Sequence, residues 1–431
     1  MMTFYYDITR LLAKVDNTTP SGIDRVDIRY AKSIVDSKNK VYFVSIVKGI
    51  FCAVDNDYGI NVINYLYNKW ILNNSIRFSK KDIKPSMFDV GFRCDCKFYK
   101  IVDRKLFNLL SNSHGGVYIN TSHYGVGKVE AYYVFKVLGN LKIVFFLHDL
   151  IPIDFPEYVN DGDKDQHIIR VRAMALFSDL IIVNSVYTEK RLYDFCDKIG
   201  ISYPKCIVNK IGIEDKFLSG NTYNNKIISG DYFVYVSTIE ARKNHIMLLN
   251  IWRDMVVTKE KNIPKLVFIG KTGWKNSSSI DMIRNCESIK EYIVHLEGVQ
   301  DDNLINIVKN AKGFLFPSFV EGWGMPLVEA IALKTPIICS DIEVFHEAGQ
   351  DLITYISPID GISWKNEILH ITNCNEYRNK KIENFRDYIM PTWERHFNIF
   401  YDVIKKIQCT PCRGVDEKTV DRFKASLVGI I

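Results

Sequence analysis

The amino-acid sequence predicts an α/β protein of two Rossmann-like, doubly wound domains that face a central cleft. Apolar, β-rich runs alternate with longer amphipathic segments over most of the 431 residues, a pattern typical of parallel sheets covered by helices on both faces. The polar stretch 218–226 divides the runs into two sets, and the length suffices for two complete cores. Ligands of such folds bind at the carboxyl edges of the strands.

The expected strands are short runs rich in apolar and β-branched residues. Those of the first sheet are 41–47, 117–120, 142–147 and 180–184. Those of the second sheet are 232–237, 265–269, 293–296, 313–316 and 336–339. A helical pattern follows over 384–408, and one face of it carries Trp393, Phe397, Phe400 and Ile404.

The composition, with 47% hydrophobic and 25% charged residues, is ordinary for a globular protein. No run of 18 uninterrupted apolar residues is present, so we expect no transmembrane helix. The first residues do not have the pattern of a secretory signal. The ten cysteines are scattered without a framework, which favours reduced thiols in the cytoplasm. The single pair Cys409 and Cys412 is a weak basis for a zinc site.

The positive charge is concentrated in residues 61–110, where ten basic residues against four acidic ones leave a surplus of six, equal to the net charge of +6. Aromatic residues, among them Trp70 and Phe107, interleave with the basic ones. This composition predicts a peripheral contact of residues 69–105 with the anionic inner face of the plasma membrane. A solvated basic face over core aromatics explains the pattern equally well. No nucleic-acid-binding motif accompanies the charge, so nucleic acid is not an expected partner.

The most informative stretch is 313–330. Its apolar start indicates a buried strand, a glycine-spaced loop follows, and Pro326 suits the first turn of a helix. Such a helix presents free amide groups and a partial positive charge to an anion. Glu321 in the loop and Glu329 in the helix would frame that anion, as the phosphate and hydroxyls of a sugar nucleotide require. A dipole-stabilising acid and a solvated loop acid would explain the two glutamates without any ligand.

Three further segments place polar or charged side chains where an expected strand ends or a helix begins. They are Arg242 and Lys243, His148 and Asp149, and the turn with Ser21, Gly22 and Arg25. Cations at such positions would neutralise a leaving diphosphate, and a glycine lets the backbone approach phosphate. A solvated helix start, a structural histidine and a plain turn are the alternatives. We expect no metal site at Asp161, Asp163 and Asp165, because no strand leads into that polar loop.

These segments resemble the motifs of family 4 of the retaining glycosyltransferases, which has the GT-B fold. The similarity is most specific over 316–330, and it extends to 332–341, 347–349, 19–26, 148–153 and 236–245. The resemblance implies an acceptor-side domain over 1–218, a nucleotide-sugar domain over 219–390, and a crossover helix with a tail over 391–431. Thr238 departs from the pattern, because the family often has an arginine there, and Arg242 is the alternative source of that charge.

The resemblance also implies a role for each candidate residue. The donor diphosphate would be held by Ser21, Gly22, Arg25, Arg242, Lys243 and the helix entry at Trp323, Gly324, Met325 and Leu327. Glu329 would bind ribose hydroxyls, while Glu321, His148 and Asp149 would orient the sugar. No metal and no cofactor are expected.

The implied activity is retaining, metal-independent transfer of a hexose from a nucleoside-diphosphate sugar to a glycan or lipid-linked acceptor, in the synthesis of bacterial surface polysaccharide such as lipopolysaccharide or capsule. Residues 148–153 and 238–244 look most like mannosyltransferase members, which makes GDP-mannose the first choice of donor. The alternative is a catalytically silent GT-B protein that binds glycan or scaffolds a complex. An NAD-dependent oxidoreductase is disfavoured, because no G-x-G-x-x-G follows the first strand.

Overall fold

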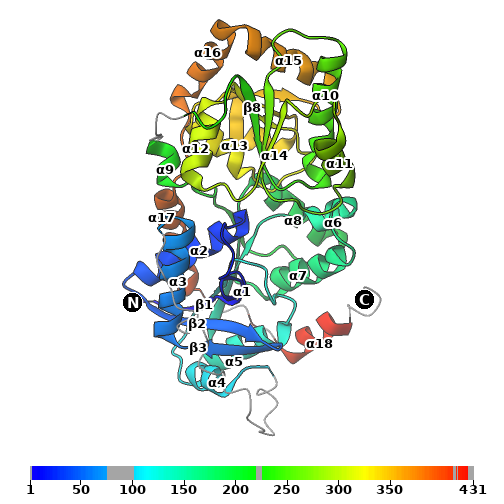
Figure 1. The fold of residues 1–431 in the computed structure, drawn as a ribbon. Helices are drawn as coiled ribbons and strands as arrows, with labels where there is room; N and C mark the ends of the chain where they lie inside the picture. The colour runs from blue at the N-terminus through cyan, green and yellow to red at the C-terminus, as the bar shows by residue number, and fades with distance from the viewer. Residues whose placement is uncertain (1, 75–100, 220–225, 411–413, 415, 426–431) are drawn as a thin grey trace.

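The structure is a computed structural model that describes residues 2–74, 101–219, 226–410, 414 and 416–425. Two sheets, each covered by helices, follow one another along the long axis of the molecule (Figure 1). Apolar strands buried between helix layers form the core of each half. The expected architecture of two doubly wound, Rossmann-like halves is confirmed.

The first sheet has the strand order β3-β2-β1-β4-β5-β6-β7. Its neighbours pair in parallel, apart from the antiparallel pair β2 and β3. The central β5 is buried at every position, as a parallel strand covered on both faces must be. The strands are β1 (Thr3–Asp7), β2 (Lys40–Val47), β3 (Ile50–Val54), β4 (Gly116–Asn120), β5 (Leu141–Leu147), β6 (Leu180–Val183) and β7 (Cys206–Val208).

The second sheet has the order β10-β9-β8-β11-β12-β13, and its described strands all pair in parallel. Every expected strand of both sheets is present, within one residue at each end. The strands that sequence analysis did not specify are β1, β3, β7 and β13. The second-sheet strands are β8 (Tyr232–Val236), β9 (Lys265–Ile269), β10 (Ile293–Leu296), β11 (Gly313–Phe316), β12 (Ile337–Ser340) and β13 (Thr354–Ile356).

Several helices begin at side-chain caps, which satisfy amide groups that have no partner within the helix. Ser21, Asp55, Asp103 and Ser185 cap α2, α3, α4 and α8 in this way. The first-half helices are α1 (Thr9–Ala13), α2 (Gly22–Asp36), α3 (Asn56–Trp70), α4 (Arg104–Ser111), α5 (Val129–Gly139), α6 (Ile151–Asp154), α7 (Asp163–Phe177), α8 (Val186–Lys198) and α9 (Asp215–Ser219).

The second half carries its helices on both faces of its sheet (Figure 1). They are α10 (His245–Val257), α11 (Ser277–Asn285), α12 (Asp301–Asn310), α13 (Met325–Ala332), α14 (Glu343–Gly349), α15 (Gly361–Asn373) and α16 (Asn375–Glu383). Short 3-10 turns occupy Pro156–Tyr158, Ala241–Lys243, Gln350–Leu352 and Asn384–Asp387.

The helix expected over 384–408 is shorter than predicted, because α17 (Trp393–Gln408) begins only after an extended segment. Pro391 disfavours a helical conformation at the residue before it. Thr392 then starts the helix, since its side chain accepts a hydrogen bond from the Arg395 amide at 3.2 Å.

Helix α17 returns to the first half, as expected. The His396 Nε2 lies 2.8 Å from the Tyr30 hydroxyl on α2, and Phe400 is fully buried beside the same ring. The tail adds α18 (Glu417–Ala425), whose Phe423 packs 5.9 Å from Phe177. The C-terminal segment is therefore structurally part of the first half.

Most of the stretch predicted to contact a membrane, residues 75–100, lies outside the described residues. Trp70 was expected on that surface, and this expectation is wrong. Its side chain is 1% exposed, and its Nε1 donates to the Asn17 carbonyl at 3.0 Å. Among the described residues, no helix has both the length and the apolarity needed to cross a bilayer.

Gly212 is required where the two connections between the halves touch. A Cβ at this position would lie 2.3 Å from the Trp393 backbone nitrogen, which has no freedom to rotate away. We expect Gly212→Ala to lower stability by about 1–3 kcal/mol, the usual cost of overpacking, measured as a lower Tm. The matched control is Gly361→Ala, because the nearest atom there is 3.9 Å away. Equal Tm values for the two variants would contradict the close approach.

Candidate functional site

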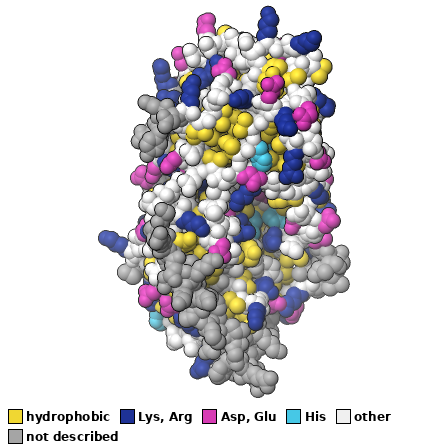
Figure 2. All heavy atoms as spheres, viewed as in Figure 1, with side chains coloured by type: hydrophobic (Ala, Val, Ile, Leu, Met, Phe, Trp, Pro, Cys, Tyr) yellow, Lys and Arg dark blue, Asp and Glu magenta, His cyan; other side chains and the backbone are white. Residues whose placement is uncertain are grey.

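A cavity of about 680 Å³ lies between the halves, where the carboxyl edges of both sheets meet. Figure 2 shows basic, acidic and histidine side chains near the middle of the molecule, where the two halves meet. The cavity is lined by nearly all residues that the sequence singled out: Ser21, Gly22, Arg25, His148, Asp149, Arg242, Lys243, Glu321, Trp323, Gly324, Met325 and Glu329.

Leu327 does not belong to this lining. Its side chain is fully buried in the core, and its amide donates to the Gly324 carbonyl at 3.0 Å. An amide already used in the helix turn is not free for phosphate. The run of free amides at the start of α13 is therefore shorter than expected.

The loop between β11 and α13 holds Glu321 against two cations of the second half. Arg242 donates to one carboxylate oxygen at 3.0 Å, and Lys243 donates to the other. Arg242 also contacts Glu240 at 2.6 Å. Burial alone would raise the pKa of Glu321, but the neighbouring charges of Arg242 and Lys243 lower it to about 2. The cations and the glutamate, which were expected to hold different parts of a donor, are thus bonded to one another.

Helix α13 begins at Gly324, whose φ of +91° suits glycine, and Pro326 lies in its first turn as expected. Glu329 follows in the second turn and is half-buried. Burial raises its pKa to about 7, although the nearby positive charge of Arg25 opposes this shift. Near neutral pH, Glu329 is therefore divided between its charged and neutral forms.

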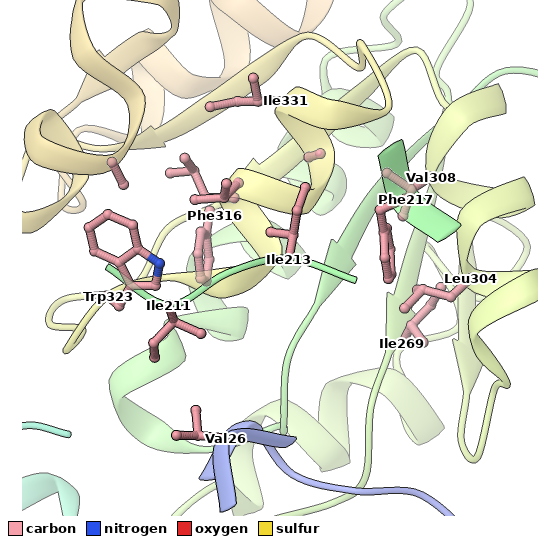
Figure 3. Close-up of a cluster of buried hydrophobic side chains, with 14 of the residues drawn as sticks. Val26, Ile211, Ile213, Phe217, Ile269, Leu304, Val308, Phe316, Trp323 and Ile331 are labelled. Carbon is pink, nitrogen blue, oxygen red and sulfur yellow. The ribbon is translucent and has the colours of Figure 1, made fainter. Parts of the chain in front are cut away.

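Trp323 packs beside Ile211 at the end of the loop (Figure 3). Its indole nitrogen is buried and has no hydrogen-bond partner among the described residues. The Lys210 ammonium lies 5.5 Å from the centroid of the ring. This side chain forms the apolar floor of the cavity, with one donor unused.

The turn before α2 reaches the opposite half. Ser21 and Asp24 form a capping box, in which the Ser21 amide donates to the Asp24 carboxylate at 2.8 Å. Arg25 then donates to both carboxylate oxygens of Asp301 on α12, at 3.0 and 2.6 Å. A Cβ at Gly22 would lie only 3.1 Å from the Met325 methyl group. Arg25 thus joins the halves, and its guanidinium is already paired.

His148 lies at the end of β5 and is almost fully buried. Its Nε2 lies 2.7 Å from the Thr121 carbonyl, and since a carbonyl can only accept, Nε2 carries the proton and Nδ1 is left as an acceptor. Burial lowers the pKa of His148 to about 4, which keeps the ring neutral at pH 7. Asp149 accepts from the Ile151 amide at 3.0 Å and so begins α6.

Two histidines that sequence analysis did not single out support this segment. His123, held at a φ of +64°, contacts the Phe146 carbonyl at 2.9 Å. The His167 ring on α7 contacts the Asp149 carbonyl at 2.9 Å. Both rings lie within 5.6 Å of one another. Isolated histidines in a helix and a loop carry no pattern that could have indicated this packing.

The two halves also meet directly at Gly322. A Cβ there would lie 2.5 Å from the His148 carbonyl oxygen. The Ser185 hydroxyl donates to the Gly322 carbonyl at 2.9 Å, and the Asn184 side chain donates to the His148 carbonyl at 2.8 Å. The glutamate loop is therefore fixed against the strand end that carries His148.

Asp163 and Asp165, expected in a polar turn, lie in the first turn of α7, and Asp161 precedes it. The described residues contain no group of three or more histidine, cysteine or acidic side chains suited to a metal ion.

Known proteins resemble this chain in both sequence and fold. Residues 224–388 match the model of the family described as glycosyl transferases group 1. The serotype-specific mannosyltransferase WbdA of Escherichia coli is 33% identical over 235 residues, which cover 49% of this chain and 28% of WbdA. The O-antigen chain mannosyltransferase RfbU of Salmonella typhimurium is 28% identical over 58% of this chain and 69% of RfbU. The chain thus matches little more than a quarter of WbdA.

Among solved structures, Anabaena HepE in complex with UDP superposes with a TM-score of 0.64 at 12% identity, over 94% of this chain and 100% of HepE. That similarity concerns the fold, which is GT-B. The chain has the GT-B fold, its residues 224–388 match the glycosyl transferases group 1 model, and it is similar in sequence to bacterial mannosyltransferases.

Proposed function

We propose that the protein is a retaining, metal-independent glycosyltransferase that moves mannose from GDP-mannose to a glycan or lipid-linked acceptor in surface polysaccharide synthesis. The main observation in support of the proposal is that one cavity is lined by Glu321, Glu329, Arg242, Lys243 and His148. Four of these five lie within the segment that matches the family model.

The proposed donor pose follows from the charges. The diphosphate lies at the start of α13, where amide groups and the helix dipole favour an anion, with Arg242 and Lys243 on its flank. Glu329 accepts hydrogen bonds from ribose hydroxyls. Glu321, ionised at neutral pH, and the Nδ1 of neutral His148 accept hydrogen bonds from hydroxyls of the sugar.

In the proposed reaction, the bond between the anomeric carbon and the diphosphate oxygen breaks on the same face that the acceptor hydroxyl attacks. The leaving diphosphate takes the acceptor proton, so the configuration is retained and no protein base is needed. Lys243 and Arg242 stabilise the negative charge that grows on the diphosphate. This role requires the two cations to share their contacts between Glu321 and the donor.

Mannose is favoured by the similarity to WbdA and RfbU, which are mannosyltransferases by name. The competing proposal is a catalytically silent GT-B protein that binds glycan. It is disfavoured because both glutamates, Lys243 and His148 are present together in one cavity. Peripheral attachment to the inner face of the plasma membrane through residues 69–105 stays a prediction.

Donor hydrolysis tests the function directly. Purified protein should release free sugar faster from GDP-mannose than from GDP-fucose, UDP-glucose or UDP-galactose, and the rate should survive EDTA. Loss of activity on chelation, restored by Mn²⁺ or Mg²⁺, would overturn metal independence. Failure to hydrolyse or bind any of these sugar nucleotides would favour the silent glycan-binding protein.

Glu329→Gln should weaken GDP-mannose binding at pH 8 about tenfold, because a carboxylate accepting hydroxyls contributes roughly 1.5–3 kcal/mol. The raised pKa of about 7 adds a pH dependence. Acidification from pH 8 to pH 6 protonates Glu329, so the wild-type affinity should fall more than that of the variant. Calorimetry measures the GDP-mannose affinity of wild type and variant at both pH values. The exposed Glu343→Gln on α14 is the control. Parallel pH profiles for wild type and variant would remove Glu329 from the donor site.

Lys243→Ala should lower kcat about 10²- to 10³-fold with little change in KM, because loss of a group that stabilises developing charge typically costs about 2.7–4 kcal/mol. The control is Lys265→Ala at the opposite edge of the same sheet, where the ammonium donates to the Ser229 hydroxyl at 3.1 Å. Steady-state kinetics distinguish the outcomes. A change confined to KM would instead make Lys243 a uniform binding contact.

A further inference from the structure

The amino edge of the first sheet, opposite the cleft, carries a second and larger hollow of about 840 Å³. We call it the basal groove. Its floor is formed by the starts of β1, β2, β4 and β5, and one wall by α4, seen at the lower end of Figure 1. None of the candidate donor-site residues discussed above lines it, and the basic stretch 69–105 contributes Lys105. The end of α17 and the segment that follows it line its far end through Gln408 and Thr410.

The charged side chains in the described lining of the basal groove are all basic. Lys40, Lys105 and Lys142 line it together with His114, and no acidic side chain is among the described lining residues. Within the described part of the chain, neither Lys40 nor Lys105 takes part in an ion pair. Uncompensated cations on a concave surface concentrate anions there.

Lys142 is the buried member of this set, with 5% of its surface exposed. Its ammonium has no hydrogen-bond partner in the described structure, and it lies 3.8 Å from the Asp179 carboxylate. That carboxylate is shared with Lys136, which is closer at 2.7 Å. Because this ammonium is buried and faces Asp179, Lys40 and Lys105 are the exposed cations of this set that an anion in the groove can reach.

The remaining lining suits a sugar chain. Tyr42 lines the groove and packs on the buried Tyr5, with ring centroids 5.2 Å apart, and the Lys40 ammonium lies 4.9 Å from the Tyr42 ring. The amide side chains of Asn108, Asn112 and Asn140 also line the groove, and the Asn112 Nδ2 already donates to the Asn108 backbone carbonyl at 2.8 Å. Aromatic faces with amides and cations beside them match the apolar faces, hydroxyls and acidic groups of an anionic oligosaccharide.

We propose that the basal groove binds an oligosaccharide that carries carboxylate or phosphate groups, as a site separate from the cleft. This goes beyond the proposed transfer reaction, because binding at the amino edge requires neither donor nor catalysis. The groove would hold a distant part of an acidic glycan.

Binding of hexagalacturonate, measured by calorimetry without nucleotide, tests the proposal. Wild type should bind it at least tenfold more tightly than neutral maltohexaose, and more weakly as NaCl rises from 50 to 300 mM. The double variant Lys40→Glu with Lys105→Glu should lose at least tenfold in affinity. The control Lys164→Glu, an exposed lysine on α7 outside the groove, should keep wild-type affinity. If the double variant fails to fold, the salt dependence and Lys105→Gln alone, with about threefold loss, decide the question.

Two competition experiments test where hexagalacturonate binds and whether the groove prefers a glycan to a simple anion. Saturating GDP should not displace hexagalacturonate, and displacement would overturn the proposal by placing the glycan in the cleft. With the cleft saturated by GDP, pyrophosphate that displaces hexagalacturonate and binds as tightly would reduce the groove to an anion site and overturn its glycan role. Absence of hexagalacturonate binding to wild type, or equal binding by the double variant, would also overturn it. Donor hydrolysis by the same samples reports separately on the proposed function.

Discussion

The contact of Gly322 with the His148 carbonyl is the constraint on which the site depends. Only a residue without a side chain permits this approach, because a Cβ would lie 2.5 Å from the oxygen. The contact aligns the glutamate loop of one sheet with the strand end of the other, and Ser185 fixes it by a hydrogen bond to the Gly322 carbonyl. Groups that lie 173 residues apart in the chain, His148 and Glu321, thereby line one cavity.

Charge balance is the second organising feature of the cavity. Arg242 and Lys243 face Glu321 and Glu240, so cations and carboxylates compensate one another without any ligand. Such pairing keeps buried charges tolerable. The donor diphosphate of the proposed function would have to compete with Glu321 for both cations, and part of its binding energy would be used in rearranging these pairs. A site arranged in this way discriminates against weakly charged molecules that fit the same volume.

Much of the fold and of the candidate site could be predicted from the sequence, because local residue patterns determine the buried strands. Buried parallel strands are continuous apolar runs, which is why β5 and β11 were predicted within one residue. The edge strands β7 and β13 are three residues long and only partly buried, so no pattern distinguishes them from loops. The partners of Arg25 and Glu321 could not be predicted either. Arg25 meets Asp301 across 276 residues, and such pairing is determined by how the halves are placed.

The chain passes between the halves twice, and both passages lie side by side. The Ile213 amide donates to the Pro391 carbonyl at 3.0 Å, and Ile213 forms a bridge with Thr392. Two neighbouring connections define a line, and rotation about that line separates the sheets while leaving both connections intact. Twisting or sliding would shear the hydrogen bond between them. Rotation about that line is therefore the relative motion of the halves that preserves this hydrogen bond.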